Sequence, residues 1–238
     1  MESSAAMPGK GLFLVIGASG QTGRRVVKSL LAKGLKARAF VRNREKAQEL
    51  RDYLAAAEIP AGNLEFSVGD PLDQTQLLGA TAGVEAVLTS LGGNVGTTGE
   101  ERESIEHFYL VKLTRAAGQN GVRQIVLCSS MGTETPEAIP RLEKILQAKR
   151  RGELVLEKSG LPYTIVRPGG LHNSPGGQPV RLARHLAGFG AISRDDVAEV
   201  MAQAVLQPEA CNRIVEIVNA ETGLPANSPD LFNQPLEL

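Results

Sequence analysis

The sequence is poor in cysteine and aromatic residues and carries no net charge. Its two cysteines, Cys128 in an apolar run and Cys211 in a later polar segment, are too few for a disulfide scaffold or a metal site. Lys plus Arg and Asp plus Glu number 26 each, which removes the electrostatic basis for binding nucleic acid. No apolar run approaches the roughly 20 residues that span a bilayer. We therefore expect no metal, no nucleic-acid partner and no membrane span. The expected compartment is the cytoplasm, or the plastid stroma if the source is a plant.

The chain contains no linker rich in Pro, Gly and Ser, and its 238 residues suffice for one hydrophobic core. Residues 1–10 are small and polar, without the apolar segment of a signal peptide, and are expected to be a flexible lead-in. A single domain is predicted over residues 11–220. Residues 221–238 are predicted to be a C-terminal tail that is loosely attached or contacts a partner. Both a monomer and a dimer are compatible with the sequence.

Three glycines spaced three residues apart follow the first apolar run, Leu12–Ile16. They stand at positions 17, 20 and 23, and apolar residues at helical spacing come after them. Such a strand, turn and helix lets backbone N–H groups approach a pyrophosphate, because glycine has no Cβ atom to keep the phosphate away. A plain connecting loop is the alternative, but the flanking strand and helix favour a dinucleotide site. Its candidate residues are Gly17, Ser19, Gly20, Gln21, Thr22 and Gly23.

Strand and helix patterns alternate along the chain, which is typical of a doubly wound parallel sheet. We therefore predict an α/β fold of the Rossmann type, with helices on both faces of the sheet. The later expected strands are Ala37–Val41, Leu64–Val68, Ala86–Ser90, Gln124–Ser129, Tyr163–Arg167 and Arg213–Val218. The expected helices include Arg44–Glu58, Glu101–Gln119, Pro140–Lys158 and Asp195–Leu206, the last preceded by a capping box that begins at Ser193.

The second expected strand ends in Arg42-Asn43-Arg44. A carboxylate at this place is typical of NAD-binding proteins, because it accepts hydrogen bonds from the ribose hydroxyls, whereas a basic residue fits the 2′-phosphate of NADP. We predict that the guanidinium of Arg42 binds this phosphate in a bidentate manner, with Asn43 beside it. The alternative is that Arg42 and Arg44 only begin a solvated helix.

The third and fourth expected strands end in residues suited to the adenosine half of a dinucleotide. Asp70, followed by Pro71, could accept a hydrogen bond from the adenine amino group or could cap the next helix. We favour the adenine contact for Asp70 and helix capping for Asp73. The glycine-rich residues 93–102 are expected to form a mobile loop at the ligand edge. The residues expected beneath the ribose and pyrophosphate are Ser90, Leu91 and Gly92.

The fifth and sixth expected strands lead to the nicotinamide end of the site. Ser129 ends the fifth expected strand and Ser130 follows it, at the edge where ligands bind in such a sheet, so both are expected where the substrate meets the nicotinamide. The turn Pro168-Gly169-Gly170 follows the sixth strand and is expected to let backbone approach the nicotinamide amide, with a simple strand-ending turn as the alternative. The segment 172–178 is rich in helix and strand breakers and is a candidate substrate lid.

Several segments together resemble the atypical short-chain dehydrogenase/reductases of the NmrA-like kind. The similarity extends over about residues 12–218. It is greatest to small NADPH-binding members from plants and cyanobacteria, and more distant to the flavin/biliverdin reductase of animals. It implies an NADP-bound Rossmann domain with a small C-terminal substrate lobe, in which Lys149 holds the nicotinamide ribose hydroxyls. The segments are GASGQTG, VRN, VGDPLD, GVRQIVLCSS, AKRRGELVLEKSGLPYTIVRPGGL and ISRDDVAEVM.

Ile145 stands four residues before Lys149, where conventional short-chain reductases have the tyrosine that protonates the substrate carbonyl. None of the three tyrosines of the chain is placed to replace it. Ser130 is then the best-placed hydroxyl, and it matches by position a serine of the flavin reductase group. The active-site histidine of that group is replaced here by Gly169. We therefore take Ser130 and Lys149 as the candidate catalytic residues.

Two functions fit this set of residues. An NADPH-dependent reductase could pass hydride to a flat conjugated acceptor, such as a flavin, quinone or bilin, which water or a hydroxyl can protonate. Alternatively, the protein is a catalytically silent NADP-binding redox sensor, regulator or assembly factor. We favour the reductase, partly by analogy of fold.

Overall fold

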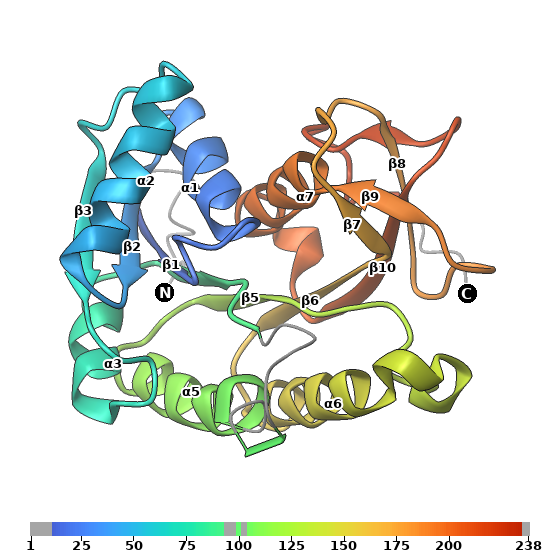
Figure 1. Ribbon diagram of the computed structural model, residues 1–238, viewed down its shortest axis with the longest axis horizontal. Coiled ribbons are helices and arrows are strands. Elements are labelled where there is room, and N and C mark those ends of the chain that lie inside the picture. Colours follow the sequence, from blue (N-terminus) through green and yellow to red (C-terminus); the bar gives the residue numbers. More distant parts are fainter. Residues whose placement is uncertain (1–10, 93–98, 101–103, 235–238) are drawn as a thin grey trace, which may run out of the picture.

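The computed structural model describes residues 11–92, 99–100 and 104–234. Within them, a nine-stranded and mostly parallel sheet has the order β11-β8-β10-β6-β5-β4-β1-β2-β3 (Figure 1). The predicted α/β fold of the Rossmann type is thereby confirmed. The strands are β1 (Leu12–Ile16), β2 (Lys36–Val41), β3 (Leu64–Val68), β4 (Ala86–Thr89), β5 (Gln124–Cys128), β6 (Tyr163–Pro168), β8 (Pro179–Ala183), β10 (Arg213–Asn219) and β11 (Leu224–Pro225).

Helices cover both faces of the sheet because successive residues of a strand point to opposite sides. Phe13 and Val15 of β1 pack in one core with α1, α2 and α7, whereas Leu14 and Ile16 pack in a second core with α3, α5 and α6. Figure 1 shows these two helical layers on either side of the strands. The helices are α1 (Gly23–Ala32), α2 (Arg44–Ala56), α3 (Gln74–Thr81), α5 (Tyr109–Gln119), α6 (Glu143–Glu157) and α7 (Arg194–Leu206).

The neighbouring strands β1 and β4 mark the point where the winding of the sheet reverses. Val15 of β1 lies opposite Ala39 of β2 on one side and Leu88 of β4 on the other, both in parallel register. The chain proceeds from β1 to β2 and β3 in one direction and from β4 to β5 and β6 in the other. The loops that follow β1 and β4 therefore diverge, and such a crevice is where ligands bind in open α/β sheets.

The C-terminal part adds strands that the sequence did not predict. β8 runs antiparallel to β10, β11 pairs with β8, and β7 (Gly170–His172) forms a separate sheet with β9 (Ala191–Ser193). The segment expected to be a loose tail is instead packed over its described residues. Leu231 and Phe232 are fully buried in the core that includes α7, because their apolar side chains gain by leaving water.

The helix starts differ most from the predicted ones in the segments 101–119 and 140–158. The described part of the segment 101–119 begins with a π-helix, η1 (Ser104–Phe108), and only then becomes α5. Pro140 starts a short 3₁₀ turn, and α6 begins at Glu143. The two predicted caps are confirmed, since Asp73 and Ser193 accept hydrogen bonds from backbone N–H groups at the starts of α3 and α7. In the described part of the chain, no helix is long and apolar enough to cross a membrane.

Candidate functional site

The glycine turn between β1 and α1 is too tight for other residues at two of its positions. Gly17 has a φ of +79°, in the left-handed region that favours glycine. A Cβ atom on Gly23 would lie 2.0 Å from the carbonyl oxygen of Gly17, so that only glycine lets the helix pack this closely on the strand. Gly20 closes the turn by donating its N–H to the same oxygen, at 2.9 Å. Glycine is therefore required at the first and third positions of this turn.

The turn that leads into α1 leaves the N–H groups of Gln21, Thr22 and Gly23 without an acceptor in the described part of the chain, whereas Arg24 and Arg25 already donate to Gly20 and Thr22. Thr22 precedes the helix, its side chain makes no capping hydrogen bond, and the first turn contains no acidic residue. The first N–H groups of a helix have no intrahelical acceptor and attract an anion. Gln21 is fixed at this end by hydrogen bonds from Arg24 and Arg25 to its side chain and backbone oxygens. The turn is therefore suited to a phosphate group.

Two adjoining cavities lie along the carboxyl ends of β1 to β4. Their volumes are about 320 and 190 Å³, and both are lined by Arg42, Pro71 and Leu91. The larger one contains Gly69, Asp70, Leu72, Ile105 and Tyr109 as well, and the smaller one Ile16, Gly17, Ser19, Gly20, Phe40, Val41, Lys46, Ser90 and Gly92. The structure thus brings together the residues predicted for the adenosine and pyrophosphate half of a dinucleotide, except Gln21, Thr22, Gly23 and Asn43, which line neither cavity.

Arg42 is exposed at the end of β2, where both cavities open. It has no hydrogen bond or ion pair within the described residues, so its guanidinium is available to an anion. Lys46, one turn into α2, lines the smaller cavity and pairs with Glu49 at 2.8 Å. The sequence analysis did not select Lys46, although its position four residues after Arg42 was a signal. Asn43 caps α2 by accepting the N–H of Lys46, so its contact with a cofactor stays a prediction.

Asp70 lies on the wall of the larger cavity, beyond β3. One of its carboxylate oxygens accepts the N–H of Leu72 at 2.8 Å, which fixes the loop, and the side chain remains exposed. Tyr109, the first residue of α5, also lines this cavity. Its hydroxyl donates to Thr89 Oγ1 at 2.9 Å, and burial raises its pKa more than this hydrogen bond lowers it. The phenol therefore stays protonated and shapes the cavity wall.

The residues after β4 fit the ribose and pyrophosphate part of a nicotinamide dinucleotide. The hydroxyl oxygen of Ser90 is buried without a hydrogen-bond partner among the described residues, although it lines the smaller cavity. Buried polar atoms normally have a partner, so this oxygen is suited to a ligand hydroxyl or phosphate. A Cβ atom on Gly17 would lie 3.0 Å from the N–H nitrogen of Leu91, so the loops after β1 and β4 approach one another closely at this point. Most of the expected loop 93–102 lies outside the described residues.

Lys149 on α6 forms an ion pair that the sequence analysis missed. Its ammonium nitrogen lies 3.1 Å from Oε2 of Glu106, which stands on the π-helix η1. Both charges flank Gly92, where a Cβ atom would lie 3.2 Å from the ammonium and 3.1 Å from Oε1 of Glu106. Single π-helical turns are frequent at functional sites and could have drawn attention to Glu106, but the sequence does not show the π-turn. Lys149 is thus placed beside the cofactor cavity.

The two serines after β5 have different surroundings. Ser129 is buried, and its hydroxyl donates to Oε1 of Glu153 on α6 instead of pointing to the edge of the sheet. Residues of a strand alternate between its two faces, so the side chain of Ser129 points toward α6, and the contact of Ser129 with the cofactor stays a prediction. Ser130 is half-buried, and its hydroxyl donates to the carbonyl oxygen of Met131 at 3.1 Å. Ser130 is accordingly the serine that could face a substrate.

The turn at Pro168, Gly169 and Gly170 serves packing within the protein. The N–H groups of Gly169 and Gly170 already bind the carbonyl oxygens of Ile217 and Gly190. A Cβ atom on Gly169 would lie 2.3 Å from the Gly190 oxygen, so the close approach that requires glycine is to Gly190. This favours the strand-ending turn over the expected backbone contact with the nicotinamide amide. The candidate lid also begins later than expected, because His172 belongs to β7.

The comparisons with known proteins agree with this site. A model of the NAD(P)H-binding family matches residues 17–208. The chain is 34% identical to an uncharacterized chloroplastic protein of Arabidopsis thaliana, over 97% of this chain and 84% of the relative. A solved structure from Bacillus halodurans, a candidate NAD-dependent epimerase/dehydratase, is similar with a TM-score of 0.81 at 30% identity and covers 91% of this chain and 97% of that one. Sanguinarine reductase of Eschscholzia californica is 28% identical, over 93% of this chain and 94% of the relative. The chain therefore belongs to the NAD(P)H-binding family and has the features of the atypical short-chain dehydrogenase/reductases that its sequence resembles.

Proposed function

We propose that the protein is an NADPH-dependent reductase that passes hydride to a flat conjugated acceptor such as a flavin, quinone or bilin. The observation that carries this proposal is the position of Arg42, a cation without a protein partner among the described residues, at the mouth of both cavities. The relationship to sanguinarine reductase supports a reductase. The narrower assignment to NmrA-like proteins and the cytoplasmic or stromal compartment stay predictions.

NADP is favoured over NAD by the charge around the end of β2. A 2′-phosphate carries negative charge that a guanidinium recognises with two parallel hydrogen bonds. Lys46 adds a second cation on the wall of the same cavity. Asp70 lies on the other side, in the larger cavity, where it is suited to the adenine amino group. We therefore expect the adenosine ribose to lie between Arg42 and Leu91.

The acceptor class follows from the small number of side chains at the site that could donate a proton. Ile145 cannot donate a proton, and the hydroxyl of Tyr109 is held by Thr89. When bound, the cofactor supplies a hydride. Lys149 would bind its nicotinamide ribose hydroxyls, and Ser130 or water would supply a proton to an acceptor that requires one. A conjugated acceptor tolerates this arrangement better than a simple ketone does, because its developing charge is delocalised.

A catalytically silent NADP-binding regulator or assembly factor is the second candidate. Ile145 is the observation in its favour, because the proton donor of conventional short-chain reductases is missing at that position. A regulator needs the cofactor cavities but neither Ser130 nor an acceptor site. Binding and turnover therefore distinguish the two candidates.

The test mixes purified protein and NADPH with a panel of flavins, quinones and bilins and follows the absorbance of the reduced nicotinamide. A reductase oxidises NADPH with at least one acceptor, and Lys149→Met lowers that rate, whereas Lys144→Met, an exposed lysine of the same helix, does not. If NADPH binds and no acceptor is reduced, the regulator becomes the better proposal. Unchanged turnover in Ser130→Ala would show that the proton comes from elsewhere.

A further inference from the structure

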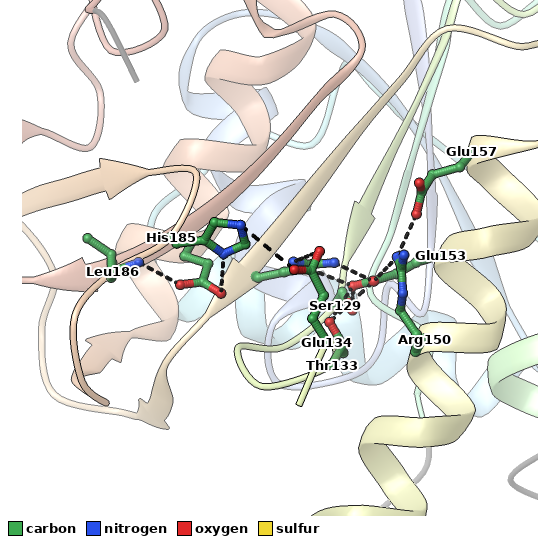
Figure 2. A network of polar contacts seen from close by, with 10 residues as sticks. Ser129, Thr133, Glu134, Arg150, Glu153, Glu157, His185 and Leu186 are labelled. Carbon is green, nitrogen blue, oxygen red and sulfur yellow. Dashed lines mark hydrogen bonds and ion pairs between the residues drawn. The ribbon is translucent and has the colours of Figure 1, made fainter. Parts of the chain in front are cut away.

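Glu153 on α6 is a buried carboxylate that takes no direct part in the proposed reaction. Its side chain is completely buried, and a buried charge is costly unless it is paired and hydrogen-bonded. In the described part of the chain, its two oxygens accept hydrogen bonds from two guanidinium groups and two hydroxyl groups (Figure 2). The donors are Arg150, Arg167, Ser129 and Thr133. A polar cluster in which every member has its partners holds the elements that supply them rigidly together.

The two hydroxyl donors of this cluster stand on either side of Ser130. The hydroxyl of Ser129 donates to Oε1 of Glu153, and Oγ1 of Thr133 lies 3.2 Å from each of the two carboxylate oxygens. Both residues are buried. The loop after β5 is therefore attached to α6 one residue before Ser130 and three residues after it.

The backbone of the same loop is held by β6 and presents Ser130 to the other side. The N–H of Ser129 donates to the carbonyl oxygen of Val166 at 2.7 Å, and that of Met131 to Pro168 at 3.0 Å. Successive N–H groups of an extended chain point to opposite sides, so the N–H of Ser130 points toward β4, the other neighbour of β5. In the described part of the chain this N–H has no acceptor. Ser130 is thus turned toward the loop after β4, which lines the candidate cofactor cavity.

The helix that holds this loop also carries Lys149. Lys149 and Glu153 are four residues apart on α6 and therefore lie on the same face of the helix. Lys149 pairs with Glu106 of η1, and α6 and η1 are in close contact, because a Cβ atom on Gly152 would lie 2.1 Å from the carbonyl oxygen of Glu106. One helix thus sets the position of Lys149 directly and, through Glu153, the position of the loop that contains Ser130.

We infer that Glu153 is a positioning residue, which fixes Ser130 relative to Lys149 at the nicotinamide end of the site. The inference rests on the proposed reductase function and deepens it, since it names the residue on which the geometry of the two candidate catalytic residues depends. Glu153 itself touches neither cofactor nor acceptor. Arg167 extends the same attachment to the far end of the loop, where it donates to Oε1 of Glu134 at 2.8 Å.

The test removes a donor to Glu153, because substituting Glu153 itself would leave Arg167 unpaired in the interior. Thr133→Val deletes one hydroxyl and keeps both guanidinium partners, and Thr133→Ser retains the hydroxyl. Thr164→Val is the matched control. Thr164 is also a buried threonine, and its hydroxyl donates to the carbonyl oxygen of Ala210 at 2.6 Å, but it stands near the start of β6, at the opposite edge of the sheet. Urea titrations of all variants show whether their stabilities are comparable.

Turnover of NADPH with an acceptor that the unmodified protein reduces is the first measurement. We expect Thr133→Val to lower kcat about tenfold at an unchanged KM for NADPH, because misplacing a reacting group by about 1 Å can cost about a hundredfold. Thr133→Ser should restore the rate, and Thr164→Val should not lower it. In a Ser130→Ala background, Thr133→Val should have little further effect, since the residue that the loop positions is gone. The same loss in that background, an equal loss in Thr164→Val, or an unchanged kcat in Thr133→Val would overturn the inference.

Fluorescence of bound NADPH is the second measurement and requires no acceptor. The emission comes from the reduced nicotinamide, so it reports the surroundings of that ring. It should change in Thr133→Val but not in Thr164→Val, whereas the affinity for 2′,5′-ADP stays the same in both. Such a change without reduction of any acceptor by the unmodified protein would support the role of Glu153 and contradict the reductase proposal. If no acceptor is reduced and the emission is unchanged as well, both proposals are contradicted.

Discussion

The ammonium nitrogen of Lys149 lies 3.1 Å from Oε2 of Glu106, and the two side chains meet beside Gly92. They come from different helices, α6 and the π-helix η1, and reach the edge of the cofactor cavity together. The ion pair fixes the position from which Lys149 can bind ribose hydroxyls. We expect Lys149→Met to weaken NADPH binding about tenfold, because a hydrogen bond from a charged group contributes about 1.5–3 kcal/mol.

Binding of 2′,5′-ADP, which lacks the nicotinamide half, distinguishes this role from a general loss of structure. Its affinity is expected to be unchanged in Lys149→Met, and calorimetry of both ligands provides the measurement. Lys144→Met is the control. A parallel loss of both ligands would contradict the placement of Lys149 at the nicotinamide ribose.

Arg42 is expected to determine the preference for NADPH over NADH. Arg42→Ala removes the guanidinium that faces the 2′-phosphate, so NADPH affinity falls about tenfold or more while NADH affinity changes little. Arg44→Ala removes a neighbouring exposed arginine that lines neither cavity and is the control. Equal affinities of the unmodified protein for the two cofactors would refute the assignment.

Gly23 is expected to tolerate no side chain. In Gly23→Ala the new methyl group would lie 2.0 Å from the Gly17 carbonyl oxygen, so α1 must move away from β1. Such overpacking costs about 1–3 kcal/mol of unfolding free energy and should also weaken NADPH binding. Gly79→Ala in α3 places its methyl group in open space and should stabilise the helix by about 0.5–1 kcal/mol. Urea titrations of both variants test the contrast.

Glu153 and Arg167 form an ion pair that is almost completely buried, with 2.8 Å between Oε2 and Nη2. Removing the charge of Glu153 leaves the guanidinium in the interior without its main partner. Glu153→Gln is therefore expected to lower the unfolding free energy by about 3–5 kcal/mol. Glu157→Gln, in the same network but partly exposed, should cost less than about 1 kcal/mol. A similar small loss in both variants would contradict this account.

Glu134 is expected to contribute to the loss of fold stability at acidic pH. Burial alone raises its pKa, but the hydrogen bond and charge of Arg167 outweigh burial and hold the pKa below the ordinary value. A carboxyl with a lowered folded pKa stabilises the fold above its unfolded pKa, about 4.3, and this contribution is lost as the pH falls through the folded value. Stability in the acid range should therefore depend less on pH in Glu134→Gln than in the unmodified protein. Urea midpoints across that range, with Glu209→Gln as control, provide the measurement.

Local sequence patterns were sufficient to predict the central part of the fold. The apolar run before Gly17, the glycines up to Gly23 and the alternation of strands and helices depend on neighbours in the chain. The carboxyl ends of parallel strands must meet at one edge, so Arg42, Asp70 and Ser90 could be placed around one site before their distances were known. The caps at Asp73 and Ser193 are local as well, because a side chain there reaches the N–H groups of the next turn.

Only the tertiary structure decided which side chains meet across long separations in sequence. Glu106 faces Lys149 across 43 residues, and Ser129 turns from the site to Glu153 because its strand presents that side to α6. Position 169 requires glycine because a Cβ atom there would clash with the carbonyl oxygen of Gly190. Phe232 of the C-terminal segment packs in the core that includes α7. These contacts depend on how the elements pack, and the spacing of residues along the chain does not predict that packing.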